Sequence, residues 1–240
     1  MPDILDQLVG KLQTALGPEL VSVVLYGSAA TGDHNEKFSD YNILCVLRQL
    51  GTSELRAAEP VFRWWREKGN PAPLLMTEEE VRTSTDCFPI EFHDIREHHR
   101  ILYGPNLVAA LEIDVSFYRA QVEHELRAKL LRLRQKASGV LSDKDVLTRM
   151  MADSIATFSV LFRHALLLAG QPGPASRRKI VAAAAEYFAL DPAPLTTLLG
   201  IREGGARPRD VEPETLLAAY MKQVEKVVAA VDLLPTGNPR

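Results

Sequence analysis

The sequence has few cysteines, no long apolar run and an N-terminus without basic residues, and each shortage excludes a class of protein. Two cysteines among 240 residues, Cys45 and Cys87, are too few for a disulfide framework or a thiolate metal site, so we expect two reduced core thiols. No apolar run approaches the ~20 residues that cross a bilayer. Asp3 and Asp6 stand where a secretory signal carries basic residues. These features predict a cytoplasmic protein with no membrane partner.

The charge is small overall but uneven along the chain. The formal net charge is −3. Residues 1–110 hold 10 basic and 16 acidic residues, whereas residues 111–240 hold 18 basic and 15 acidic residues. The basic excess of the second half is too small for a dedicated duplex-binding protein, so we expect no nucleic-acid partner. With 46% apolar and 25% charged residues, the composition is typical of a globular chain of one large or two modest domains.

Hydrophobic patterns divide the chain into an α/β part and a helical part. In the first part, short β-branched runs alternate with helical stripes, and Ser53 and the Thr77/Glu80 pair are predicted to cap two of the helices. In the second part, apolar residues recur only at helical spacing. We expect an α+β fold, with a mixed-sheet domain over 1–110 and an all-helical bundle over 111–240. The predicted strands are 21–26, 42–47, 72–76 and 89–95, and the predicted helices are 3–16, 53–68, 114–137, 143–169, 176–190 and 213–234, with one short helix before the last.

The most informative segment joins the first two predicted strands. After the first strand, Gly27 permits close approach of the backbone to a ligand, and Ser28 adds a hydroxyl where a helix begins, a combination suited to phosphate oxygens. Asp40 and Asn42 stand two positions apart at the mouth of the next strand, which places both side chains on one face. Paired oxygen donors near a phosphate cradle suit Mg²⁺. The alternative is an Asx turn in which both side chains bond to their own backbone.

These residues carry a resemblance to a known family. Gly27-Ser28, Gly32 and Ser39-Asp40-x-Asn42 resemble the signature of the nucleotidyltransferase superfamily, which has the DNA polymerase beta-like fold, and in particular its bacterial aminoglycoside-nucleotidyltransferase-like members. The resemblance implies that Gly27, Ser28 and Ser39 bind the nucleotide. It also implies that Asp40, Asn42 and a third carboxylate hold Mg²⁺ or Mn²⁺, with Asp40 and the third carboxylate as catalytic residues.

The third carboxylate is assigned to Glu91 on the predicted strand 89–95. Its neighbours Ile90 and Phe92 point the other way on a strand, and Asp94 is the second choice. The alternative is that Glu91 is merely the solvent-facing residue of an edge strand.

The resemblance implies transfer of a nucleoside monophosphate from a nucleoside triphosphate to a hydroxyl or similar acceptor on a small molecule or a protein. Pyrophosphate is the second product. Glu123 and Glu125 are the candidates for a general base on the helical part, and the motif selects neither. Related enzymes can be dimers, so a homodimer is an open alternative.

Asn42 departs from the family pattern, which has an aspartate there. An amide oxygen can bind Mg²⁺ but brings no negative charge, and two-metal phosphoryl transfer depends on such charge. A second hypothesis is therefore a weak or inactive member that binds a nucleotide or a partner protein.

Three further groups are interpreted as structural. His93, His98 and His99 lack the neighbouring ligands of a zinc site. Trp64 and Trp65 have the spacing of core residues, although an aromatic platform for a base is the alternative. The basic run on the helix 114–137 is interpreted as a solvated face rather than a surface that steers triphosphate or RNA. Its members are Arg127, Lys129, Arg132, Arg134 and Lys136.

Overall fold

The computed structural model describes residues 3–30, 41–174, 176–205 and 212–234. The chain divides into two compact units, Met1–Asp114 and Val115–Arg240. The boundary predicted after residue 110 lies shortly before this division. Each unit is described below by itself.

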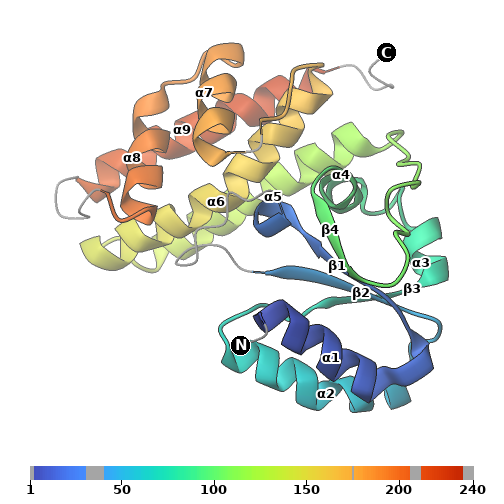
Figure 1. Ribbon diagram of the computed structural model, residues 1–240. Coiled ribbons are helices and arrows are strands. Elements are labelled where there is room, and N and C mark those ends of the chain that lie inside the picture. The colour runs from blue at the N-terminus through green and yellow to red at the C-terminus, as the bar shows by residue number, and fades with distance from the viewer. Residues whose placement is uncertain (1–2, 31–40, 175, 206–211, 235–240) are drawn as a thin grey trace. The chain divides into compact units, whose positions relative to one another are not determined.

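The first unit is built on a mixed four-stranded sheet with the order β3-β2-β1-β4 (Figure 1). β1 is antiparallel to both of its neighbours, whereas β2 and β3 are parallel. A mixed sheet followed by helices confirms the predicted α+β class. The strands are β1 (Leu20–Tyr26), β2 (Asn42–Leu47), β3 (Leu74–Thr77) and β4 (His99–Tyr103).

Alternation along the strands sends side chains into two cores on opposite faces of the sheet. On one face, Leu25 and Ile43 pack with α1 and α2, which lie side by side in Figure 1. On the other face, Val24 and Leu44 pack with Phe92 of α4. The helices and short 3₁₀ turns described in this unit are α1 (Ile4–Leu16), η1 (Gly17–Glu19), η2 (Gly27–Ala30), α2 (Thr52–Glu67), α3 (Glu78–Thr83) and α4 (Pro89–Glu97).

The strand predicted over 89–95 is wrong, because this segment is the helix α4. Pro89 occupies the first helical turn, where its missing N–H costs nothing. Phe92 and Ile95, three positions apart, are both buried. Alternation of Ile90 and Phe92 imitates a strand over a few residues, but the apolar contacts follow helical spacing. The fourth strand is the next segment, β4.

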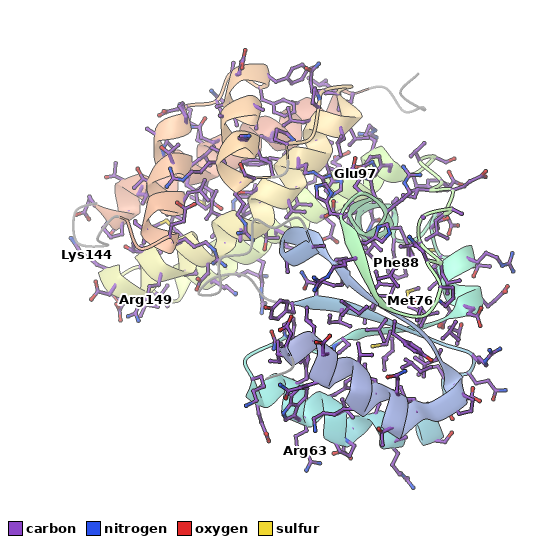
Figure 2. All side chains as sticks on the ribbon, viewed as in Figure 1. Arg63, Met76, Phe88, Glu97, Lys144 and Arg149 are labelled. Atoms are coloured by element: carbon purple, nitrogen blue, oxygen red, sulfur yellow. The ribbon has the colours of Figure 1, made fainter. Side chains whose placement is uncertain are left out.

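Two other predictions in this unit need correction. Helix α2 begins after Gly51 rather than Ser53, because the Glu54 carboxylate accepts a hydrogen bond from the Gly51 N–H at 2.8 Å. Cys45 is a buried thiol as predicted, and burial raises its pKa to about 12. Cys87 is exposed instead, because it lies in the turn between α3 and α4, next to the exposed Phe88 labelled in Figure 2.

The second unit is helical in its described part, as predicted. Helix α6 is central, with α5, α7, α8 and α9 packed against it. The Asp143 side chain caps its first turn by accepting from the Val146 N–H at 3.0 Å. In its interior, the Tyr118 hydroxyl lies 2.5 Å from Nδ1 of the buried His164. The helices are α5 (Tyr118–Ser138), α6 (Lys144–Leu168), α7 (Arg177–Tyr187), α8 (Pro192–Arg202) and α9 (Pro213–Asp232).

Helix α6 is long and apolar enough, by length and composition alone, to pass as a membrane span. The helix contains no long uninterrupted apolar run, because polar residues are interspersed along it, but its mean hydropathy is high. In the structure, 61% of its most apolar window is buried inside the protein. That burial is typical of a core helix.

Candidate functional site

The end of β1 turns sharply at Gly27. Its φ of +77° lies in the left-handed region that favours glycine. The chain then enters the 3₁₀ turn η2, and the Gly27 N–H donates to the His98 carbonyl at 3.0 Å. The predicted helical turn after the strand is therefore present. The N–H of Gly27 itself is already engaged and points to the end of α4.

Asn42 lies beside this turn. It is the first residue of β2 and pairs in register with Tyr26, the last residue of β1. A Cβ atom added to Gly27 would lie 3.2 Å from Nδ2 of Asn42. Gly27 and Asn42, fifteen positions apart in the sequence, are thus direct neighbours in space. Because Leu44 belongs to the core on the α4 side, alternation assigns Asn42 to that same face.

The carboxylates of Glu91 and Asp94 on α4 affect the pKa of Tyr26, the last residue of β1. Burial is the main cause of a raised pKa at Tyr26, and the negative charges of Glu91 and Asp94 raise it further. Tyr26 packs on the α4 face of the sheet, which is also the face of Asn42. Glu91, exposed on a helix and not on an edge strand, is thus within electrostatic reach of the β1 end, and so is Asp94.

We call the group Tyr26, Gly27, Asn42, Glu91 and Asp94 the sheet-end site. It consists of one phenol, one backbone turn, one amide and two carboxylates. Tyr26 was not singled out by the motif, although its alternation with Val24 could have assigned it to this face. Ser39 and Asp40 lie outside the described residues, as does the hydroxyl group of Ser28, so their predicted roles stay predictions.

The histidines that follow are held in local contacts. Nδ1 of His99 lies 3.0 Å from the Arg96 carbonyl oxygen, and Nε2 lies 3.0 Å from Nδ2 of Asn106. His93 and His98 each place Nδ1 3.7 Å from one carboxylate oxygen of Glu97, which is labelled in Figure 2. Both ring nitrogens of His99 are therefore occupied, one by the last turn of α4 and one by the loop after β4.

The two candidates for a general base lie in ion pairs on α5. Glu123 accepts from Arg127 at 2.7 Å and from Arg119 at 2.8 Å. The hydrogen bond from Arg127 is the main cause of a lowered pKa at Glu123. Glu125 lies 3.3 Å from the Lys129 ammonium. A lowered pKa makes Glu123 a weaker proton acceptor. Glu125 is engaged by Lys129, so the structure does not favour either residue as the base.

The first unit thus has a mixed sheet with a glycine turn at the end of β1, and a helical unit follows it along the chain. No protein-family model matches the sequence, and no curated protein sequence is significantly similar to it. A solved structure has this fold: spectinomycin adenyltransferase AAD(9) from Enterococcus faecialis, crystallised with ATP and spectinomycin. The likeness covers 93% of this chain and 98% of that chain, with a TM-score of 0.61 and 13% sequence identity. This chain is thus similar in fold to a bacterial aminoglycoside nucleotidyltransferase.

Proposed function

We propose that the protein is a nucleotidyltransferase that moves a nucleoside monophosphate from a nucleoside triphosphate to a hydroxyl or similar group of a small-molecule acceptor. One observation supports the proposal: the fold match covers 93% of this chain and so extends over both units. The structurally similar enzyme is an adenyltransferase in complex with ATP and spectinomycin, which favours ATP as donor.

The sheet-end site has the donor chemistry of a Mg²⁺ site. Carboxylate and amide oxygens are the ligands that this hard cation prefers. Asn42 and Glu91 would hold it together with Asp40, and Asp94 is the substitute for Glu91. Burial is the main cause of the raised pKa of Tyr26, and the negative charges of Glu91 and Asp94, which a cation would offset, raise it further. When bound, Mg²⁺ supplies charge stabilisation to phosphoryl oxygens.

The chain's own residues would bind and orient the triphosphate. Gly27 keeps the backbone open to close approach, because it carries no Cβ beside Asn42. Its N–H is engaged by His98, so phosphate contacts would come from the following N–H groups of η2 and from the Ser28 hydroxyl. Positioning of this kind supplies most of the catalysis in phosphoryl transfer.

The decisive experiment follows pyrophosphate release and label transfer from α-labelled nucleoside triphosphates, with Mg²⁺ or Mn²⁺ and spectinomycin among the acceptors. We expect Asp40→Asn to lower turnover by roughly 100-fold or more, because it removes an oriented charge. Asp86→Asn is the matched control, since Asp86 is an exposed acid on the loop before α4. Equal turnover in the wild type and Asp40→Asn would contradict the proposal.

A second candidate function rests on Asn42. With an amide in place of an acid, the site has less charge for metal binding, which favours a protein that binds nucleotide without turnover. Titration calorimetry with ATP and Mg²⁺ separates the two functions. Binding without pyrophosphate release supports the second candidate, whereas release supports the first.

A further inference from the structure

A groove between α5 and α6 collects basic side chains over an apolar floor. Its volume is about 530 Å³, within the ~300–1,000 Å³ typical of small-molecule pockets. Figure 2 labels Arg149 on α6, near the end of the unit where α5 gives way to α6. The residues that matter to the argument are Lys129, Arg132 and Lys136 of α5, Arg149 of α6, and the apolar Leu133 and Met150 between them.

The basic residues of α5 separate into two sets by their partners. Arg127 and Arg134 face α9, where they pair with Asp232 at 3.5 Å and Glu225 at 2.7 Å. These two are accounted for as structural ion pairs. All five basic residues of the run are exposed, as predicted for a solvated face.

The second set lines the groove. Within the described residues, neither Arg132 nor Lys136 has an ion-pair or hydrogen-bond partner. Arg149 donates only Nε to a backbone carbonyl, that of Asp145, at 3.3 Å. Asp153, an acid at the rim, is paired with Arg202 at 3.3 Å. The groove thus presents positive charge that the described residues leave unneutralised.

The cations repel one another weakly when no anion is bound. Arg132 and Lys136 stand four positions apart on one helix, where like charges repel, and Arg149 adds a third cation from the opposite wall. A bound anion would relieve that repulsion. Below the cations, Leu133 is buried and Met150 is half-buried, and a methionine at a binding surface adapts to apolar groups of varied shape.

We propose that the α5–α6 groove binds a small organic anion with an apolar body and at least two negative charges. Charge complementarity selects the anionic head, and the Leu133–Met150 floor selects the apolar body. The groove volume of about 530 Å³ is sufficient for a small organic molecule. This site lies wholly within the helical unit and does not depend on the proposed transfer activity.

Titration calorimetry of the full chain with 1-naphthyl phosphate tests the proposal. Inorganic phosphate supplies the charge alone and 1-naphthol the apolar body alone, and we expect both to bind more weakly. The double variant Arg132→Gln/Lys136→Gln should weaken 1-naphthyl phosphate binding by roughly tenfold or more, because two charge-assisted contacts are lost. Arg127→Gln/Arg134→Gln removes the same charge from the same helix outside the groove and should change binding by less than about twofold.

A second variant tests the floor with the charges intact. Met150→Trp fills the groove and should also weaken binding, and its melting curve verifies folding. Methyl NMR should show shifts at Leu133 and Met150 upon addition of the probe. Equal losses in both double variants would overturn the proposal, because long-range attraction alone would explain them. Binding no tighter than that of inorganic phosphate, or methyl shifts confined to other residues, would overturn it as well.

Discussion

The sheet-end site and the α5–α6 groove have opposite charge and are assembled in different ways. At the sheet end, strand register joins Tyr26 to Asn42, and a hydrogen bond joins Gly27 to His98, which lies far along the chain. In the groove, three of the four cations come from a single helix at intervals of three and four residues. Long-range pairing therefore creates the acidic site, whereas local periodicity creates most of the basic one. Substitutions in the two units should differ accordingly.

The largest expected effect comes from a glycine that supports the sheet. A Cβ at Gly104 would lie 2.0 Å from the Val21 carbonyl oxygen, and its φ is +75°. Gly104→Ala should therefore lower the free energy of unfolding of the first unit by about 3 kcal/mol or more. Urea denaturation followed by tryptophan fluorescence measures this unit, because both tryptophans lie in it.

The matched control lies in the helical unit. Gly170 has a φ of +70°, but a Cβ there would have no atom within 4 Å. Gly170→Ala should cost only about 1 kcal/mol, from backbone strain alone. It should leave the tryptophan transition in place. Similar losses in the two variants would remove the contrast between the units.

The next effect concerns charge at the sheet end. Asn42→Asp adds a carboxylate beside Gly27, so we expect Mg²⁺-dependent turnover to rise by roughly tenfold or more. Asn70→Asp, in the loop after α2, adds the same charge elsewhere and should leave turnover unchanged. Calorimetric Mg²⁺ titration accompanies the rate measurements. An unchanged Mg²⁺ affinity in Asn42→Asp would show that the amide of Asn42 does not weaken Mg²⁺ binding.

Capping should cost about the same in both units, because it is a local interaction. Asp143→Ala removes the acceptor for the Val146 N–H, and Thr77→Ala removes the acceptor for the Glu80 N–H at 3.1 Å. Each should lose about 1 kcal/mol of unfolding free energy. Circular dichroism during urea denaturation measures both. Asp143→Asn restores an acceptor and should recover most of the loss, and its failure to do so would argue against the cap.

The smallest effect is a pH dependence in the helical unit. The pKa of Glu123 is lowered in the folded state, so its ion pairs stabilise the fold above the ordinary glutamate pKa of ~4.3 and lose that contribution as the pH falls. Glu123→Gln should cost less than about 1 kcal/mol at pH 7, since such pairs are weak. Its difference from the wild type, measured by urea denaturation, should shrink toward pH 3. A difference that grows on acidification would reverse the assigned sign.

Sequence patterns succeeded where local interactions decide the structure. The apolar stripe that ends at Gly17 predicted α1, and the β-branched run predicted β1. Asp143 was predicted as a cap of α6. They failed for α4, because a short apolar run fits two periods and only packing against the sheet selects one. Cys87 was misplaced for a related reason, since burial of a small thiol depends on where a turn lies.

The candidate site divides in the same manner. Gly27 and Asn42 were predicted as site residues from the motif, and they lie close together because β1 and β2 are adjacent strands. Glu91 was selected on the premise of a strand, and its link to the sheet end comes instead from α4 and the electrostatics of Tyr26. The sequence did not show that Arg132 and Lys136 lack partners among the described residues, because pairing depends on which acids α9 and α6 bring near.

The amino-acid order by itself determined the α/β-then-helical layout, the glycine turn and the helical spacing of the basic residues. All of these depend on backbone preferences and contacts between near neighbours. Only the tertiary structure decided which acids approach the end of β1 and which cations remain without partners in the described part of the chain. Those outcomes arise from side chains far apart in the chain, whose meeting is set by how helices and strands pack.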